Sequence, residues 1–246
     1  MIFFSRKLFL VDYLQGYVDI HNHIIPGLDD GAKTIEDSLE LIQRFQEFGV
    51  NRFICTPHIM HNYYDNTPRT IKKSFDKLKK SISKDKRFET VNLDYAAEHL
   101  IDNHFENNLE KGEVLPLNEQ HILIEMSYLQ SSINFDESVQ KIKEKGYFPV
   151  LAHPERYQYL AMEYGKYSYY KSNDVKFQLN LLSLGNYYGK SIKKNALRLL
   201  DDQMYDFIAS DVHHVQHIAH LKKVTISKKV LNKILPILNK TIESFY

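Results

Sequence analysis

The feature of this sequence that most constrains its fold is a regular alternation of short apolar segments with longer charged segments. The apolar segments are rich in Val, Ile, Phe and Leu and predict buried strands, and the charged stretches between them have the spacing of amphipathic helices. The predicted strands lie at 17–21, 52–56, 92–98, 121–126, 148–153, 176–182 and 205–210. Because long crossovers join neighbouring parallel strands, this series predicts a parallel sheet.

Local signals mark several of the helices. Thr34 and Asp37 have the spacing of a capping box, and Thr67-Pro68 is a typical helix start. Further helices are predicted within 135–146, 189–202 and 230–245. Pro236 predicts a kink in the last of them.

Seven strand and helix units in one series predict an α/β protein with a TIM-like (β/α)7 barrel. The chain of 246 residues is long enough for one such domain, 1–246, in which 1–16 forms an extension before the first strand. An open, doubly wound sheet is the alternative, because periodicity does not distinguish a closed sheet from an open one.

Composition excludes some classes of partner and compartment. Lys and Arg number 32 against 31 Asp and Glu, so the net charge of +1 predicts no nucleic-acid partner and no anionic membrane surface. The apolar opening segment is interrupted by Arg6, Lys7 and Asp12, which argues against membrane insertion. A single cysteine, Cys55, excludes an internal disulfide and favours a cytoplasmic protein.

Residues with metal-binding side chains recur at the ends of the predicted strands. In barrels of this kind the carboxyl ends of the strands carry the catalytic groups. The first strand ends in Asp19, His21 and His23, which the two-residue period places on one face, away from Ile20. Five later strand ends supply His58, Glu98, Glu125, His153 with Arg156, and Asp211 with His213, whereas His99 is expected on the opposite face.

Each of these positions also has a structural interpretation. A histidine pair can be a polar strand end, a lone glutamate a salt-bridge partner, and Asp211 a helix cap. Convergence of six strand ends favours a metal site over these separate explanations. The remaining histidines are interpreted as structural (His61, His104, His121) or as surface and supporting residues (His214, His217, His220).

Five imidazoles and three carboxylates exceed the needs of one tetrahedral zinc ion. They suit two or three divalent ions, with manganese, iron or zinc favoured by the mixed nitrogen and oxygen ligands. Such a cluster generates hydroxide from bound water and polarises a phosphoryl oxygen, which predicts phosphoester hydrolysis. Arg156 could grip the phosphate in bidentate fashion, or equally could bridge surface acids.

The motifs resemble those of the PHP (polymerase and histidinol phosphatase) superfamily. The matching phrases are "DIHNHIIPGLDDGAKT", "CTPHIM", "AAEH", "ILIEMS", "VLAHPERY", "QLNLLSL" followed by "YGK", and "ASDVHH", in order over residues 19–214. Within the superfamily, the sequence most resembles bacterial metal-dependent protein-tyrosine phosphatases of capsule and exopolysaccharide biosynthesis.

The resemblance implies a distorted TIM-like (β/α)7 barrel with a multinuclear, often manganese-dependent site at its carboxyl-terminal end. Among the implied ligands, we expect Glu98 to bridge metal ions. The implied metal ligands are His21, His23, His58, Glu98, Glu125, His153, Asp211 and His213. Arg156 is implied as the phosphate contact and, with Asp211 and His213, as a catalytic residue. The implied substrate is phosphotyrosine on a tyrosine autokinase, and a homo-oligomer is left open.

Two further observations bear on the tyrosine-phosphatase interpretation. Cysteine-dependent enzymes need an arginine six residues after the thiolate, where this chain has His61 after Cys55. A second phosphate-directed arginine is expected in some relatives, yet none follows Arg198. His214, His217 and Lys222 are candidates to replace it.

Other questions stay open at the level of sequence. A histidinol-phosphate-type phosphatase, a nuclease-like enzyme and a catalytically inactive, metal-binding regulatory domain are the alternative functions. Asp19 is expected to orient an imidazole from outside the metal shell, whereas Asp29 and Asp30 could order their loop or approach the metals. The tyrosine-rich segment 164–170 is interpreted as packing rather than as a peptide-binding rim.

Overall fold

The computed structural model describes residues 7–246, so the first six residues of the predicted extension 1–16 lie outside the described residues. The strands are β1 (Leu8–Phe9), β2 (Val18–Asp19), β3 (Arg52–Cys55), β4 (His58–Ile59), β5 (Asn92–Tyr95), β6 (Glu98–Leu100), β7 (His121–Glu125), β8 (Phe148–Ala152), β9 (Lys176–Asn180), β10 (Phe207–Ala209) and β11 (Thr225–Ile226). The helices are α1 (Ile35–Gln46), α2 (Pro68–Ile82), α3 (Asn103–Lys111), α4 (Phe135–Glu144), α5 (Gln158–Met162), α6 (Gly165–Ser172), α7 (Lys190–Asp201), α8 (Val215–Leu221) and α9 (Lys228–Phe245).

All seven predicted strands are present and run parallel to their neighbours. They form a six-stranded sheet in the order β10-β9-β8-β7-β6-β4 and a three-stranded sheet in the order β2-β3-β5. The third predicted strand is split into β5 and β6, and β4 follows β3 beyond the end of the second predicted strand. The break between β3 and β4 falls at Pro57, which has no backbone N–H to donate to a sheet.

The strand order follows the chain, which distinguishes this fold from a doubly wound sheet, where the order reverses. The first and last of these strands meet beyond their carboxyl ends through an isolated parallel bridge between Asn22 and Val212. Backbone hydrogen bonds run from Asp211 to His21 (2.8 Å) and from His23 to Val212 (2.9 Å). The α/β class with a parallel sheet is therefore confirmed, but within residues 7–246 no continuous ladder joins β2 to β10.

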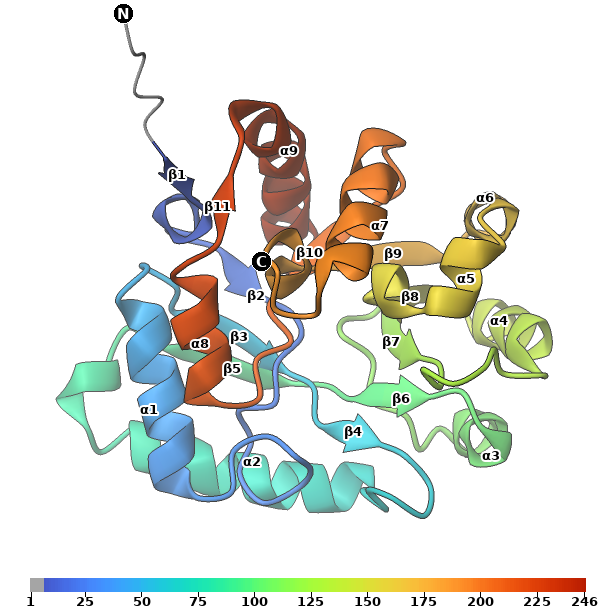
Figure 1. Ribbon diagram of the computed structural model, residues 1–246. Helices are drawn as coiled ribbons and strands as arrows, with labels where there is room; N and C mark the ends of the chain where they lie inside the picture. Colours follow the sequence, from blue (N-terminus) through green and yellow to red (C-terminus); the bar gives the residue numbers. More distant parts are fainter. Residues whose placement is uncertain (1–6) are drawn as a thin grey trace, which may run out of the picture.

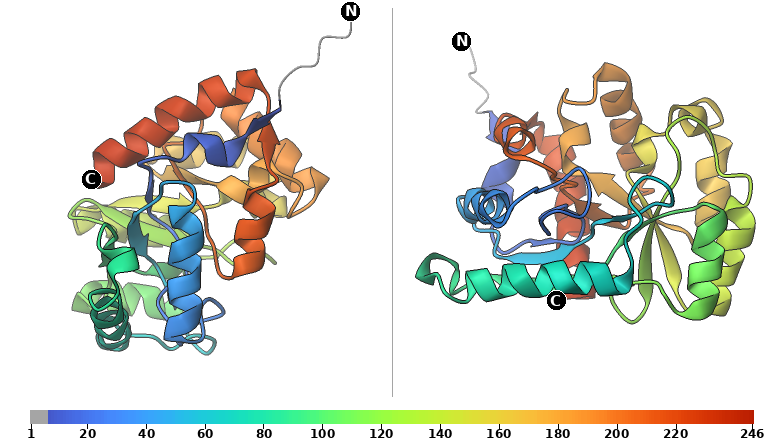
Figure 2. Two further views of the ribbon diagram at one scale, coloured as in Figure 1. Left: turned by 90° about the vertical axis from the view of Figure 1, so that its left-hand side faces the viewer. Right: turned by 90° about the horizontal axis from the view of Figure 1, so that it is seen from below.

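A separate buried cluster fills the space that the strands surround. Its members come from alternate positions of β2, β3, β7, β8 and β10 and from adjoining residues: Val18, Ile20, Ile54, Ala96, Leu117, Leu123, Val150, Ala152, Phe207 and Ala209. Such side chains fill the interior of a small barrel. Ile242 and Phe245 of α9 pack against this cluster. Seen from below, the strands lie inside and most helices lie around them (Figure 2).

The predicted helix starts are confirmed. Thr34 with Asp37 and Thr67 with Thr70 both form reciprocal capping boxes. Pro236 lies within α9, which continues through it to Phe245. The short antiparallel pair β1–β11, at the upper left of Figure 1, has no counterpart in the predicted strands.

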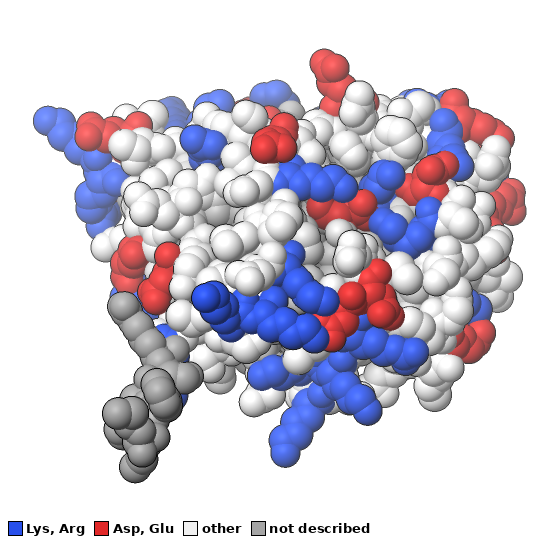
Figure 3. Space-filling model, turned by 90° about the horizontal axis from the view of Figure 1, so that it is seen from above, with Lys and Arg blue, Asp and Glu red and all other residues white. Residues whose placement is uncertain are grey.

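The tyrosine-rich segment, the distribution of charge and the character of the helices complete the description of the fold. Tyr167 and Tyr170 of the tyrosine-rich segment are buried, which supports packing as their role. Basic and acidic side chains both occur on the face shown in Figure 3, with neutral surface between them. None of the helices within residues 7–246 combines the length and apolar character that crossing a membrane requires.

Candidate metal centre

The side chains at the strand ends converge on one buried cluster. Their donor atoms form three groups, each of which could hold a cation: His21, His23, Glu98 and Asp211; His58, Glu98 and Glu125; and His23, Asp30, His58 and His213. His153, the remaining predicted ligand, places its Nε2 3.1 Å from Glu98 Oε1. The structure thus brings together all eight residues that the sequence analysis singled out as metal ligands.

Glu98 is shared between two of the three groups. Its Oε2 lies 3.1 Å from His21 Nε2 and 3.1 Å from His58 Nδ1. The side chain of Glu98 is completely buried and opens β6, where its backbone N–H donates to the carbonyl of Pro57. A carboxylate in this position can contribute an oxygen to either of the two donor groups.

Several donor atoms in the cluster lie close together without hydrogen bonding. Glu98 Oε2, Glu125 Oε1 and His58 Nδ1 have no hydrogen-bond partner, although Glu125 Oε1 and His58 Nδ1 are only 2.9 Å apart. The Nε2 atoms of His21 and His23 also lie close together, 3.4 Å apart, where a hydrogen bond between them depends on the tautomer. Buried polar atoms without partners are costly, so convergence of their lone pairs fits a bound cation.

The electrostatics of the cluster also fit a cation. Burial by itself raises the pKa of Glu98 and Asp211, but neighbouring imidazoles, with His21 foremost, hold both pKa values well below the usual range. Burial lowers the pKa of His58, yet Glu125 and Glu98 raise it to about 9. Ionised carboxylates in this number need positive charge at the centre, and metal ions can supply it in place of protons.

Asp29 and Asp30 contact different parts of the cluster. The sequence leaves open whether they order their loop or approach the metals. Asp29 Oδ2 lies 2.8 Å from His23 Nδ1 and also accepts the backbone N–H of His58. Asp29 therefore orders the loop and orients an imidazole. Asp30 Oδ1 instead lies 3.4 Å from His213 Nε2 and 3.7 Å from His58 Nε2, which makes Asp30 a candidate ligand that the sequence analysis did not choose.

The expected role of Asp19 is corrected by the structure. Its carboxylate accepts hydrogen bonds from the backbone and hydroxyl of Ser210, at 2.9 and 2.6 Å, and orients no imidazole. Asp19, at the end of β2, therefore links β2 by hydrogen bonds to Ser210, which follows β10. His21 is oriented by Gln178, whose Oε1 lies 2.9 Å from Nδ1. Sequence reasoning missed Gln178, since a glutamine within an apolar strand was its only signal.

Arg156 lies at the rim of the cluster. One of its terminal nitrogens, Nη1, lies 2.6 Å from Asp211 Oδ2. The guanidinium packs over the rings of Tyr128 and Tyr188, at 4.7 and 4.3 Å from their centroids. Cation–π contacts on two rings fix the orientation of the guanidinium beside the candidate ligands.

Two of the three residues suggested as replacements for a second arginine, Lys222 and His217, have other partners. Lys222 pairs with Glu47, so its charge is not free for the centre. His217 is buried, and its Nδ1 receives the backbone N–H of His213 at 3.2 Å. Cys55 is fully buried, and burial raises the pKa of its thiol, which excludes it as an exposed nucleophile.

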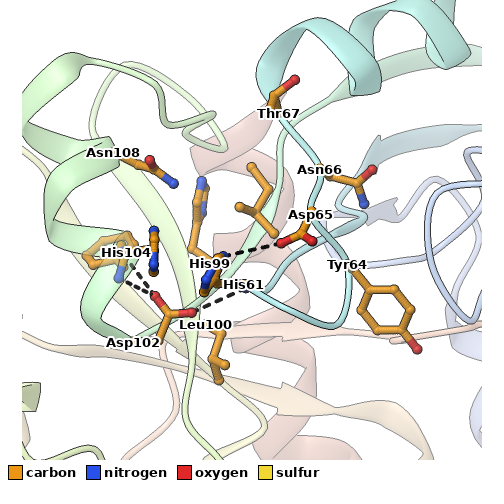
Figure 4. A pocket seen from close by; sticks show the side chains of 12 residues that line it. His61, Tyr64, Asp65, Asn66, Thr67, His99, Leu100, Asp102, His104 and Asn108 are labelled. Atoms are coloured by element: carbon orange, nitrogen blue, oxygen red, sulfur yellow. Dashed lines mark hydrogen bonds and ion pairs between the residues drawn. The ribbon is translucent and has the colours of Figure 1, made fainter.

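A hollow of about 170 Å³ adjoins the cluster between the segments that follow β4 and β6. His61 and His104 stack on its wall with ring centroids 3.5 Å apart, beside Asp65 and Asp102 (Figure 4). The ring of Tyr64 also lines it and stacks on His58 at 5.4 Å. The donor atoms of these side chains form no metal-binding group among the described residues.

Comparison with known proteins assigns this arrangement to a family. Residues 17–234 match the family model for capsular polysaccharide synthesis, CpsB/CapC. The chain belongs to the CpsB/CapC family. The matched region includes every candidate ligand described above, and the family assignment agrees with the resemblance to PHP-type phosphatases.

Individual relatives cover most of the chain. The tyrosine-protein phosphatase YwqE of Bacillus subtilis is 32% identical over 202 residues, which are 81% of this chain and 78% of that protein. The tyrosine-protein phosphatase CpsB of Streptococcus agalactiae is 30% identical, over 80% of this chain and 83% of that protein. The putative tyrosine-protein phosphatase CapC of Staphylococcus aureus is 28% identical, over 87% and 84%.

Solved structures agree with the family assignment. Similarity is found to a structure from a study of YwqE from B. subtilis and CpsB from Streptococcus pneumoniae, described as unique metal-dependent tyrosine phosphatases. The TM-score is 0.75 at 29% identity, and the match covers 91% of this chain and 94% of that one. A phosphotriesterase homology protein from Escherichia coli matches with a TM-score of 0.51 at 10% identity, which supports the fold alone.

Proposed function

We propose that this protein is a metal-dependent protein-tyrosine phosphatase that hydrolyses phosphotyrosine without a cysteine nucleophile. The observation that carries the proposal is the convergence of three donor groups on Glu98 and His58, with the guanidinium of Arg156 at their edge. Relatives in the CpsB/CapC family that bear the name of tyrosine phosphatase support the choice of substrate.

We propose that the cluster holds two or three divalent ions, with manganese favoured and iron or zinc as alternatives. His21, His23, His58, Glu98, Glu125, His153, Asp211 and His213 would hold them, with Asp30 as an additional ligand. When bound, such ions supply Lewis acidity that polarises a phosphoryl oxygen and activates water. Glu98 would bridge two ions because its Oε2 faces His21 and His58 equally.

The protein's own residues would position the phosphate. Arg156 is held by Asp211 and by two tyrosine rings, so its remaining N–H groups can donate to phosphate oxygens with little loss of side-chain freedom. Gln178 and Asp29 would keep the imidazoles of His21 and His23 in fixed orientations. We further propose that the substrate is phosphotyrosine on a cytoplasmic tyrosine kinase of capsule or exopolysaccharide synthesis.

The proposal is tested by phosphate release from manganese-loaded protein. A phosphotyrosyl peptide, a phosphoseryl peptide and histidinol phosphate are compared by kcat/KM. The His21→Ala variant serves as the control for contaminating phosphatases, because it lacks a ligand of the central group. We expect the phosphotyrosyl peptide to be the best substrate by at least about tenfold. A preference for histidinol phosphate, or equal activity of the His21→Ala variant, would overturn the proposal.

A further inference from the structure

A groove opens at the rim of the candidate metal centre. Its volume is about 510 Å³, and it is lined by Tyr128, Leu129, Arg156, Gln158, Tyr159, Met162, Tyr188 and Ile192. These residues come from the segments that follow β7, β8 and β9, so the groove lies at the carboxyl ends of the strands with the metal-binding side chains. The lining is apolar and aromatic apart from Arg156 and Gln158.

The groove presents apolar side chains to solvent to an unusual degree. Leu129 is 92% exposed and Met162 is 80% exposed, and both line the groove. Tyr128, at 45% exposed, continues the same surface toward the metal centre. Large apolar side chains gathered at the mouth of a site indicate contact with a partner or substrate.

The groove is continuous with the centre through two side chains. The Tyr128 hydroxyl lies 3.2 Å from His153 Nε2, and the Tyr128 ring stacks on the ring of His153. Arg156 forms part of the groove wall and also contacts Asp211. A molecule whose phosphate reaches Arg156 therefore has its adjoining atoms at the entrance of the groove.

The chemistry of the lining favours an apolar occupant. Residues that line the groove include no acidic side chain to pair with a basic group. The single positive charge, on Arg156, is already paired with Asp211 and covered by two rings. A basic side chain entering this groove would lose hydration without gaining an acidic partner, whereas an apolar side chain would bury its own surface and that of Leu129 and Met162.

We propose that this groove binds an apolar side chain next to the phosphotyrosine of a polypeptide substrate, and so sets sequence preference around the scissile phosphate. The inference rests on the proposed function, since it places the phosphate at the metal centre. It defines the substrate class as peptides with leucine-like or aromatic residues flanking the phosphotyrosine. Tyr128 lies between the candidate metal centre and this groove, because it contacts His153 and also lines the groove.

The test uses three phosphotyrosyl peptides that differ only in the two residues flanking the phosphotyrosine, which are leucine, glycine or lysine. With the manganese-loaded wild-type protein, we expect kcat/KM for the leucine peptide to exceed that of the glycine peptide by about tenfold, mainly through KM. The lysine peptide is expected to be no better than the glycine peptide. Binding of matching peptides with a non-hydrolysable phosphonate, measured by fluorescence anisotropy, should follow the same order.

Two variants test whether the groove itself, rather than any exposed apolar side chain, causes the preference for the leucine peptide. In Leu129→Ser/Met162→Ser, both changed side chains are largely exposed, so the fold should be retained. The leucine-to-glycine ratio is expected to fall to about one in this variant. Tyr63→Ser is the matched control, because Tyr63 is 78% exposed and does not line the groove. The control should keep the wild-type ratio.

The outcomes distinguish this inference from the proposed function. If the wild-type protein hydrolyses none of the peptides, the proposed function fails. If it hydrolyses all three equally, or if the double variant keeps the wild-type ratio, the groove inference fails alone. A ratio that drops equally in Tyr63→Ser would assign the preference to the wider rim and also overturn the inference.

Discussion

At the scale of single residues, the centre depends on groups that hold imidazoles as well as on the imidazoles themselves. His21 Nδ1 faces Gln178 and His23 Nδ1 faces Asp29, which leaves both Nε2 atoms pointing at the carboxylates. Hydrogen bonds to the second ring nitrogen fix the tautomer and the orientation of a ligand histidine. The partner atoms are an amide oxygen of Gln178 and a carboxylate oxygen of Asp29, and both can accept a hydrogen bond from an imidazole N–H.

The Gln178→Leu variant tests this orientation. The change keeps the volume of a side chain that is completely buried but removes the acceptor for His21 Nδ1. We expect metal affinity to fall by about 10–100-fold, measured by competition with a fluorescent chelator. Gln216→Ala, at an exposed position of α8, is the control and should keep the wild-type affinity. Unchanged affinity in Gln178→Leu would contradict the assigned role.

A second residue-scale prediction concerns Cys55. Its thiol lies within the buried core, and burial raises its pKa, so it is not available for nucleophilic attack. We expect Cys55→Ala to keep kcat within about twofold while losing some stability through the small cavity. Phosphatase assays with circular dichroism on the same sample test this. A folded but inactive Cys55→Ala protein would refute a mechanism without cysteine.

At the scale of structural elements, the segment between β2 and α1 connects the sheet to the centre. Gly31 lies where this loop passes His23, four residues beyond β2: an added Cβ would be 2.2 Å from the backbone oxygen of His23. The backbone N–H of Gly31 donates to Asp29 Oδ1 at 2.9 Å, which joins the close passage to the residue that orients His23. Glycine at this position therefore determines where Asp29 and Asp30 lie.

The Gly31→Ala variant is predicted to displace this loop. Because the clashing atom belongs to the backbone, the loop must move and carry Asp29 and Asp30 with it. We expect kcat/KM to fall by about 100-fold, with lower metal content by mass spectrometry. Gly165→Ala is the matched control, since a Cβ there meets nothing within 4 Å. If Gly31→Ala and Gly165→Ala have the same kcat/KM and metal content, the close approach at Gly31 does not affect the centre, and the prediction is wrong.

At the scale of the whole molecule, the centre joins the ends of strands that one continuous hydrogen-bonded ladder does not link within residues 7–246. The two sheets meet through the successive strands β3/β4 and β5/β6, and β2 meets β10 through one bridge. Ligands from both sides of these breaks enter the same groups, with His21 and His23 beyond β2 and Asp211 beyond β10. Bound metal should therefore stabilise the fold as well as enable chemistry.

Metal removal is predicted to lower thermal stability. At metal concentrations about 100 times the dissociation constant, binding contributes about 2.7 kcal/mol. For a chain of this size, that corresponds to a melting temperature about 5–10 °C higher than that of the chelated protein. Differential scanning calorimetry with and without a chelator, followed by addition of excess manganese, measures the shift. An unchanged melting temperature would argue against a structural contribution of the metal.

The amino-terminal end of the strands, opposite the metal centre, supplies a prediction about pH. His121 at the start of β7 packs among Phe148, Phe207 and Phe245, and burial lowers its pKa to about 4, with Lys176 adding to the effect. The unfolded chain binds this proton more readily, so the stabilising contribution is complete above about pH 6.5 and is lost as pH falls toward 4.

The His121→Gln variant isolates this contribution. Between pH 7 and pH 4, wild type should lose about 1–2 kcal/mol more unfolding free energy than the variant, a value reduced for partial solvent screening. Denaturant unfolding of the metal-free proteins at several pH values measures the difference. His220→Gln, exposed on α8, is the control for loss of one histidine and should follow wild type. Parallel pH profiles for wild type and His121→Gln would contradict the prediction.

Much of this protein could be predicted from its sequence. The alternation of apolar and charged segments predicted seven parallel strands and their order along the chain, because strand and helix periods depend on local pattern. The same pattern placed residues with metal-binding side chains at the carboxyl ends of the predicted strands. Since the carboxyl ends of parallel strands meet at one end of a barrel, His21, Glu98 and Asp211 could be assigned to a common site before any distance was known.

Only the tertiary structure decided how these groups face one another. The breaks after β3 and β5, the bridge between Asn22 and Val212 and the bond from Asp19 to Ser210 depend on contacts between segments far apart in the chain. The same is true of Gln178 on His21, of Asp30 among the candidate ligands and of the apolar groove beside Arg156. Sequence periodicity determines the face on which a side chain lies, but orientation and partners depend on distances of a few ångströms between elements, which only packing determines.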